Sequence, residues 1–364
     1  LHAKNWFGHP RGLTILFLTE MWDQFSFFGM RALLVYYMTK QLMISQTHSS
    51  YIYGLYSSFV YFTPLIGGVI SDRWLGRRRA VIIGSSIMAL GHFLMAFESL
   101  FYFALATIAI GNGLFLPSLA SQINQLYAPD DPRRATAYNI YYVGINLGAF
   151  LAPFVCGTVG EIYGWHWGFT LAGVGMVIGL CTYLGGSRYL PKNNGSEERR
   201  LTPAPQRPQA KFEIYLLLLA VIAIVVIFRA SYEQSGNTVA LWADSGVDRQ
   251  IAHAFSIPMT WFQSLNPLFI FLFTPVIVIY WTRRAQSGRE PASISKMATG
   301  GFIVGASYLL LAAVAYFSGD ARASWLWLVL FFFIYTVGEL FILPVGLGLF
   351  GKLAPLEFAA TAIA

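Results

Sequence analysis

The sequence predicts an all-α polytopic membrane protein. Its 364 residues are 56% hydrophobic and only 11% charged, whereas soluble domains carry about 25% charged residues. Apolar stretches of about 20 residues, the length that crosses a bilayer as a helix, recur along the whole chain. The basic residues gather in the connections between these stretches, so the net charge of +7 indicates membrane orientation rather than binding to nucleic acid.

Ten stretches qualify as transmembrane helices, six before and four after a Pro-rich, charged segment. That segment, 188–211, predicts a cytoplasmic linker. We therefore expect an N-terminal six-helix half over 1–187 and a C-terminal half over 212–364. A pseudo-symmetric arrangement of two halves would need twelve spans, so about ten are expected to be present and the C-terminal half to be truncated after the tenth. The expected spans are 12–39, 49–71, 79–97, 100–125, 136–159, 167–187, 212–240, 256–281, 297–317 and 324–350.

The distribution of Lys and Arg predicts the orientation. If the N-terminus is cytoplasmic, nineteen basic residues fall on the cytoplasmic side and three on the other. This bias is typical of integral membrane proteins. We expect a protein of the plasma (inner) membrane with its N-terminus and the 188–211 linker in the cytoplasm.

The first span carries charge where a lipid-facing helix should carry none. Two acids and an arginine recur at helical spacing and share one face with an amide and an aromatic ring. Charged groups inside a bilayer are costly, and they face a bundle interior or a watery cavity that serves an ion or substrate. These face residues are Glu20, Asp23, Gln24, Phe27 and Arg31, and the other ionisable residues within spans are Arg229, Glu233 and Glu339.

A glycine- and arginine-rich string closes the second span. It reads Gly67-Gly68-Val-Ile-Ser-Asp72-Arg73-Trp-Leu-Gly76-Arg77-Arg78-Arg79 and resembles the loop signature of the major facilitator superfamily. Glycines permit close helix contact, and the arginines keep the loop in the cytoplasm. An ordinary positively charged loop is the alternative. The candidate gating residues are Gly68, Asp72, Arg73, Gly76 and Arg77.

Further motifs lie at 20–29, 138–150, 164–169, 233–234, 262–267 and 338–347. Taken in their order and spacing, these motifs resemble the proton-dependent oligopeptide transporter family. The resemblance runs from about 12 to 357 and implies the major facilitator fold of two pseudo-symmetric helical halves.

This resemblance implies a secondary active transporter that imports di- and tripeptides in symport with protons. Transport would proceed by alternating access through a central cavity, and the substrate and ion sites of such folds lie near the bilayer midplane. No cofactor other than the coupling proton, no metal and no nucleic acid is expected, and the protein is not expected to be an enzyme. We expect a functional monomer in the lipid bilayer.

A zwitterionic peptide needs a cation at its carboxylate and an anion at its amine. Arg31 suits the carboxylate because its guanidinium binds it in a bidentate manner, and the resemblance assigns the amine to Glu339. The expected proton-coupling residues are Glu20, Asp23, Glu233 and Glu339. The expected substrate-binding residues are Phe27, Phe28, Arg31, Tyr61, Asn146, Arg229, Asn266 and Glu339.

The chain also departs from the family pattern. Gln24 stands where the family has an arginine, and Leu116 stands where it has a lysine, so two expected cations are missing. Phe27 and Phe28 replace two tyrosines. Arg229 occupies a position that is usually aromatic. We expect protons to balance the acids of spans one and ten, and Arg31 and Arg229 to share the peptide carboxylate.

Blander interpretations remain open at this stage. Glu20 and Asp23 could be structural polar groups, Arg229 and Glu233 an intrahelical pair, and Asn146 and Asn266 hydrogen-bonding contacts between helices. One functional alternative is a proton-uncoupled or differently coupled transporter of another small solute. Another is a membrane receptor or enzyme, although the His-Glu-x-x-His string of an intramembrane metalloprotease does not occur.

Overall fold

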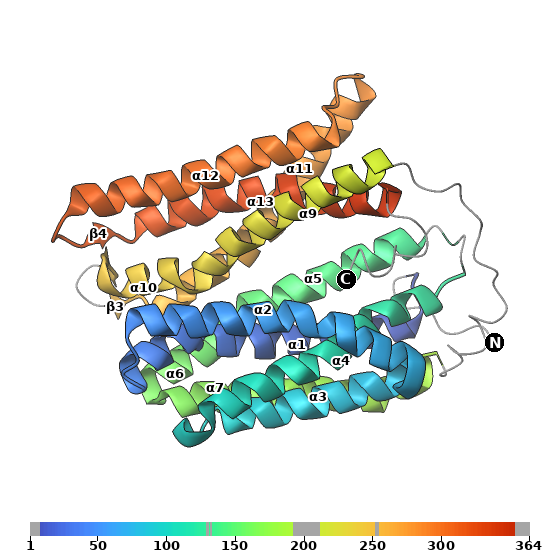
Figure 1. Ribbon diagram of the computed structural model, residues 1–364, viewed down its shortest axis with the longest axis horizontal. Helices are drawn as coiled ribbons and strands as arrows, with labels where there is room; N and C mark the ends of the chain where they lie inside the picture. The colour runs from blue at the N-terminus through green and yellow to red at the C-terminus, as the bar shows by residue number, and fades with distance from the viewer. Residues whose placement is uncertain (1–7, 129–130, 132, 192–211, 252–254, 354–364) are drawn as a thin grey trace. The chain divides into compact units, whose positions relative to one another are not determined.

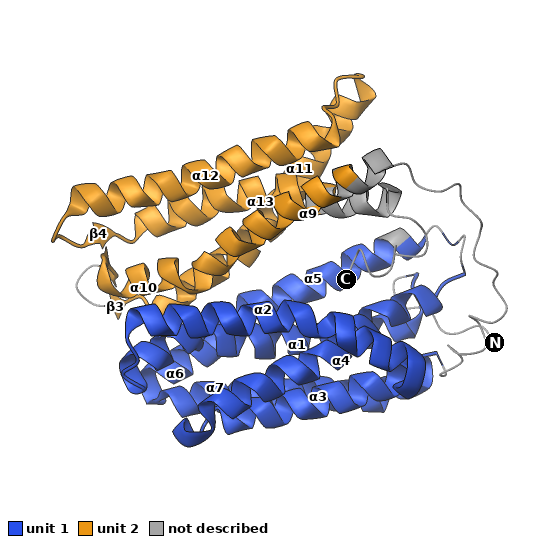
Figure 2. Cartoon of the chain, in the orientation of Figure 1, with its two compact units in different colours: residues 1–203 blue, residues 204–364 orange. Residues whose placement is uncertain are grey.

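The computed structural model describes residues 8–128, 131, 133–191, 212–251 and 255–353. Within these residues the chain is almost entirely helical (Figure 1). It divides into two compact units, residues 1–203 and 204–364 (Figure 2). Most of the expected linker, 192–211, lies outside the described residues.

The first unit is a bundle of long helices. α1 and α2 each continue into one π-helical turn, Tyr37–Gln41 and Ser71–Leu75, and a third such turn, Pro153–Gly157, joins α5 to the short α6. The fifth expected span is therefore one continuous helical path built from two labelled helices. The helices are α1 (Arg11–Tyr36), α2 (Gln46–Ile70), α3 (Arg77–Leu94), α4 (Phe101–Gln125), α5 (Arg133–Ala152), α6 (Thr158–Tyr163) and α7 (Trp165–Gly186).

Within its described residues, 212–251 and 255–353, the second unit contains four long helices, one short α-helix and four two-residue strands. β1 pairs with β4 in parallel, and β2 pairs with β3 antiparallel. Both pairs join segments that connect the helices. The helices are α9 (Phe212–Glu233), α10 (Thr238–Ser245), α11 (Leu265–Gln286), α12 (Ser293–Ser318) and α13 (Leu326–Leu353), and the strands are β1 (Val247–Asp248), β2 (Gln250–Ile251), β3 (Phe255–Ser256) and β4 (Ala323–Ser324).

The seventh expected span, 212–240, is interrupted in the structure. α9 ends at Glu233, a single 3₁₀ turn follows over Gln234–Gly236, and α10 begins at Thr238. Asn237 between them has φ −120° and ψ −87°, which is outside the helical region. The prediction of one uninterrupted helix was wrong here because hydropathy does not register a break at a glycine and an asparagine.

Seven helices in the described part of the chain are long and apolar enough to cross a membrane. α1, α3 and α9 coincide with the other three expected spans, and α1 is less apolar because its buried face holds Glu20, Asp23 and Arg31. The expectation of about ten spans therefore agrees with the helices. The seven apolar spans are Gln46–Leu75, Glu98–Gln125, Thr136–Tyr163, Trp165–Tyr189, Met259–Gln286, Ser293–Ser318 and Leu326–Leu343.

Two local features fix the position of α2 and the turn after it. The Ser45 hydroxyl accepts a hydrogen bond from the backbone amide of His48 and caps the start of α2. Gly76 has φ +74°, a conformation that glycine adopts without strain. The chain reverses there, and α3 begins with three arginines. The turn residue of the loop motif is thereby explained by backbone geometry.

α2 and α4 cross at a pair of glycines. A Cβ atom built on Gly67 would lie 2.0 Å from the carbonyl oxygen of Gly113, and one on Gly113 would lie 2.8 Å from Thr63. Asn112 donates to the carbonyl of Val60 over 3.1 Å at the same crossing. The small residues thus allow backbone contact between two apolar helices, as expected for helices in a membrane.

We predict that Gly67→Ala destabilises the protein by about 1–3 kcal/mol, because the methyl group forces the α2–α4 backbones apart. Thermal unfolding of the purified protein in detergent measures this effect. Gly54→Ala is the matched control on the same helix, since a Cβ there meets no atom within 4 Å. Equal stability of the two variants would contradict the close crossing.

Candidate functional site

The two acids of α1 are buried together and accept hydrogen bonds from uncharged donors. Glu20 is fully buried and Asp23 is 1% exposed. The Gln24 amide donates to Glu20 Oε1 over 2.9 Å and to Asp23 Oδ2 over 3.2 Å. The Tyr141 hydroxyl of α5 donates to the other Glu20 oxygen, Oε2. The residue that replaces the family's arginine therefore bridges both acids without adding a charge.

The packing of α1 against α5 and α7 brings these groups together. A Cβ on Gly148 of α5 would lie 2.2 Å from the Met21 carbonyl, and a Cβ on Gly175 of α7 would lie 2.6 Å from the Phe25 ring. α5 therefore approaches the α1 backbone closely, and α7 packs tightly on an α1 side chain, so both helices help to bury the two acids. Tyr141 comes within hydrogen-bonding reach of Glu20 through this contact.

Arg31 lies further along α1 and contacts aromatic side chains. It is 4% exposed, and its Nε donates to the Tyr53 hydroxyl of α2 over 2.5 Å. Its guanidinium carbon lies 5.5 Å from the centre of the Phe28 ring, a distance at which a cation is attracted by the ring face. Phe27 meets Phe28 edge to face at 5.4 Å. Three predicted substrate-binding residues thus lie close to one another.

Two other predicted residues of this unit lie elsewhere. Asn146 of α5 is 5% exposed, and its amide donates to the Tyr142 carbonyl one turn back in the same helix. Tyr61 lies on α2, about two turns beyond Tyr53, and is 45% exposed.

The second unit holds a separate polar group at the contact of α11 and α13. Asn266 Nδ2 lies 2.6 Å from Glu339 Oε2 and 3.0 Å from Thr336 Oγ1. Asn266 and Glu339 are 6% and 4% exposed, and Thr336 is fully buried. The sequence analysis named both Asn266 and Glu339, and the structure joins them by a direct hydrogen bond.

Arg229 of α9 belongs to the same neighbourhood. Its guanidinium lies over the Tyr232 ring at 5.4 Å, and its charge acts on the Glu339 carboxylate. Glu233 is half-buried at the last residue of α9, where a 3₁₀ turn takes over. The unit therefore presents a carboxylate, an amide and a guanidinium within one set of packed helices.

The loop motif links α3 to α4 through a side-chain hydrogen bond. Arg77 Nε lies 3.8 Å from Asp72 Oδ1, and Arg77 Nη1 donates to the Ser121 carbonyl over 3.4 Å. A Cβ on Gly68 would contact the Pro117 ring at 3.7 Å, so α2 and α4 meet there as well. Arg73 is exposed. The motif thus fastens the ends of three helices.

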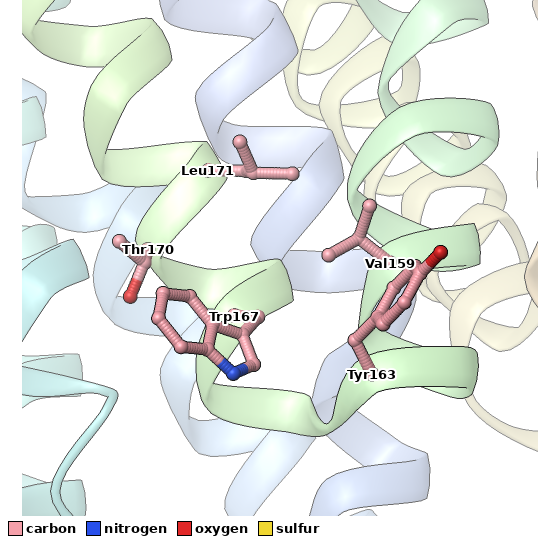
Figure 3. Close-up of a pocket in the computed structure, with 5 residues that line it drawn as sticks. All are labelled: Val159, Tyr163, Trp167, Thr170 and Leu171. Carbon is pink, nitrogen blue, oxygen red and sulfur yellow. The ribbon is translucent and has the colours of Figure 1, made fainter.

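An open concavity of about 510 Å³ lies between α6 and α7, away from any carboxylate or guanidinium in its lining (Figure 3). Tyr163 and Trp167 at its rim are 71% and 56% exposed. Exposed Trp and Tyr rings at helix ends are typical of a membrane interface. Its lining gives no means of binding a charged substrate. The lining residues are Val159, Tyr163, Trp167, Thr170 and Leu171.

Sequence reasoning missed three residues of these groups, namely Tyr53, Tyr141 and Thr336. Tyr141 lies within a motif that was used to identify the family, but its partner Glu20 is 121 positions away. Tyr53 is a tyrosine on an apolar helix with nothing in its local pattern to single it out. Thr336 could have been found from the sequence, because it lies three residues before Glu339 and so on the same helix face.

Membrane-spanning helices that bury carboxylates, amides and guanidinium groups within each of two units define a membrane transporter rather than an enzyme. The comparisons with known proteins agree. The POT family matches residues 78–207 and 206–364. The chain therefore belongs to the POT family, the proton-dependent oligopeptide transporter family that its motifs resemble, and this prediction is confirmed.

The relatives resemble the chain over nearly its whole length. The di-/tripeptide transporter of Lactococcus lactis subsp. cremoris is 33% identical over 99% of this chain and 87% of its own length. The peptide transporter YePEPT of Yersinia enterocolitica subsp. palearctica is 30% identical over 97% of this chain and 84% of its own length.

Solved structures show the same fold. A crystal structure of peptide transporter POT in complex with sulfate has a TM-score of 0.82 and 32% identity, and the match covers 99% of this chain and 86% of that one. A POT family transporter in complex with 5-aminolevulinic acid has a TM-score of 0.84 and 28% identity, with 99% and 88% covered.

We predict that Asn266→Ala lowers the free energy of unfolding by about 1–3 kcal/mol, because it leaves the buried Glu339 carboxyl and the Thr336 hydroxyl without this donor. Thermal unfolding in detergent is the measurement. Thr299→Ala is the control, since Thr299 is exposed and its hydroxyl bonds only its own helix. A loss no larger than that of the control would refute the structural part of this group.

Proposed function

We propose that this protein imports di- and tripeptides in symport with protons by alternating access. Membership of the POT family and the relatives named as di-/tripeptide transporters support this function. The observation that carries it in the molecule is the buried group of Asn266, Thr336 and Glu339, beside the charge of Arg229. A carboxylate held by an amide is suited to receive the cationic amine of a peptide.

Arg31 is the proposed ligand of the peptide carboxylate in the first unit. Its Nε donates to the Tyr53 hydroxyl, and its planar guanidinium has the geometry to bind a carboxylate through two nitrogens. Phe28 and Tyr53 border the guanidinium through their ring faces. Aromatic walls of this kind exclude water and strengthen an ionic contact with the substrate.

The remaining predicted roles follow from this assignment. Asn146 and Asn266 would bond the amide groups of the peptide, and Phe27, Phe28 and Tyr61 would contact its side chains. Glu20, Asp23, Glu233 and Glu339 are the proposed proton-coupling residues, since buried acids mark proton pathways. Gly68, Asp72, Arg73, Gly76 and Arg77 would act in gating.

We further propose that the protein works as a monomer in the plasma (inner) membrane, with its N-terminus and the linker in the cytoplasm. The strong bias of basic residues toward one set of connections supports this orientation. A protein-chemical test is the accessibility of a cysteine placed in the arginine-rich loop to a reagent that cannot cross the membrane.

We predict that purified protein in proteoliposomes takes up labelled dipeptide, and that an inward proton gradient raises the uptake. Glu339→Gln should weaken apparent peptide affinity about tenfold or more, because it removes a buried charge that would pair with the amine. The measurement is uptake with the gradient imposed and with it collapsed by an ionophore.

Asp320→Asn is the control for this experiment, because Asp320 is an exposed acid in the connection between α12 and α13. Absence of uptake of any di- or tripeptide by the wild type would reject the proposal. Equal uptake with the gradient imposed and with it collapsed would favour uncoupled transport.

We predict that Arg31→Ala and Arg229→Ala each weaken dipeptide affinity about tenfold, since each removes a proposed partner of the carboxylate. Competition by a dipeptide amide, which lacks the carboxylate, should be affected far less. Unchanged peptide affinity in Arg229→Ala would show that the shared role is wrong.

Arg284→Ala provides a matched control for Arg229→Ala. Its guanidinium also lies 5.4 Å from the centre of a tyrosine ring one turn away, that of Tyr280, but the side chain is exposed near the end of α11. The two variants remove the same type of cation–aromatic contact. If only Arg229→Ala weakens peptide affinity, the effect comes from a lost contact with the substrate and not from the lost cation–aromatic contact.

A further inference from the structure

The two acids of α1 are not equivalent in their hydrogen bonding. Both carboxylate oxygens of Glu20 accept a hydrogen bond, one from Gln24 and one from Tyr141. Asp23 accepts only the longer bond from Gln24, and its Oδ1 is buried without a hydrogen-bond partner in the described structure. Hydrogen bonds to a carboxylate favour its ionised form. The geometry therefore distinguishes the two members of the pair.

No lysine or arginine forms an ion pair with either acid in the part of the chain that the structure describes. Two carboxylates one helical turn apart repel when both are ionised, and burial strengthens this repulsion. The pair therefore titrates as a coupled unit that holds a proton on one member. The question is which member carries it.

We propose that Tyr141 is a positioning residue which, together with Gln24, keeps Glu20 as the ionised member and thereby makes Asp23 the acid that carries the proton. This inference rests on the proposed proton-coupled transport and specifies its carrier. Tyr141 does not touch the substrate in this role. It acts through Glu20.

Neighbouring groups that could compete with Tyr141 are few. α1 contributes Glu20, Asp23 and Gln24 themselves, and α5 contributes the phenol of Tyr138, whose hydroxyl donates to Asn124. α7 also packs against α1, and its Tyr183 donates to Gln122 of α4 instead. Among the described residues, the groups named around the pair are therefore carboxylic acids, amides and phenols.

The position of Tyr141 is fixed by its helix contact. Gly144 and Gly148 follow it on α5, and a Cβ on either would come within 3.0 Å of α1 backbone atoms. Tyr141 itself is 6% exposed. A phenylalanine at this position keeps the ring and removes only the hydroxyl, so Tyr141→Phe isolates the hydrogen bond to Glu20.

Infrared difference spectroscopy of the purified full-length chain tests the assignment. The carboxylic acid C=O band is followed during a pH titration of the wild type, Asp23→Asn and Glu20→Gln. We expect Asp23→Asn to lose the band that belongs to the pair at neutral pH, and Glu20→Gln to retain it. Loss of this band in Glu20→Gln with retention in Asp23→Asn would overturn the proposal.

Tyr141→Phe tests the positioning role. Without the hydroxyl, the ionised form of Glu20 loses a donor, so the proton should be shared between the two acids and the band should split. The pH profile of dipeptide uptake should move to higher pH by about one unit, the size expected for one hydrogen bond to a charged group. A spectrum and pH profile identical to those of the wild type would refute the role.

Two further variants make the result specific. Tyr183→Phe removes a similar buried hydroxyl that bonds Gln122, and it should leave both readouts unchanged. Gln24→Met removes the other donor to Glu20 and replaces Tyr141→Phe if that variant does not fold. A shift as large in Tyr183→Phe as in Tyr141→Phe would contradict the proposal.

The failure of the proposed function and the failure of this inference are distinguishable. Lack of dipeptide uptake by the wild type would reject peptide transport, but it would leave the infrared assignment of the proton to Asp23 intact. Normal, gradient-driven uptake with the band assigned to Glu20 would reject the inference and leave peptide transport standing.

Discussion

Two carboxylates on one face of a membrane-spanning helix can be held only if something other than water satisfies them. In this chain, uncharged donors reach three of the four carboxylate oxygens. Gln24 bridges Glu20 and Asp23 from the same helix, and Tyr141 reaches Glu20 from α5. The first unit is organised around this requirement, because α5 and α7 must both approach α1 closely enough to close off its acidic face.

Small residues make that closeness possible. α5 presents Gly148 to the α1 backbone, and α7 presents Gly175 and Gly179 to the α1 residues Phe25 and Trp22. In a membrane there is little hydrophobic gain from packing helices, so backbone proximity and buried hydrogen bonds contribute much of the specificity. The same logic operates where Gly67 of α2 meets Gly113 of α4. Helix packing and the state of the acids are therefore coupled in this unit.

The second unit solves a related problem differently. Its carboxylate, Glu339, is held by Asn266 across a helix contact and also feels the positive charge of Arg229. The two units thus hold their buried carboxylates in different surroundings, amide and phenol donors in the first and an amide with a guanidinium nearby in the second.

Sequence analysis identified residues that recur at helical spacing or lie in family motifs, and it missed the side-chain contacts between distant helices. Glu20, Asp23 and Arg31 were identified because helical spacing and membrane cost mark them, and Asn266 and Glu339 because family motifs contain them. Tyr53 and Tyr141 were not identified because the contact of each one depends on how two distant helices pack. The break after Glu233 escaped for a simpler reason, since one glycine and one asparagine scarcely lower the hydropathy of the surrounding stretch.

The replacement of a cation by Gln24 changes what a proton can do. When a carboxylate is paired with an arginine, protonation breaks an ion pair and releases a positive charge for another partner. When it is held by an amide and a phenol, protonation removes a buried negative charge and releases no cation. The free-energy change then comes mainly from relieving the desolvation of that charge and the repulsion between neighbouring acids. Coupling in this chain would therefore act through the packing around α1, where neutralisation relaxes the demand for close contact with α5 and α7.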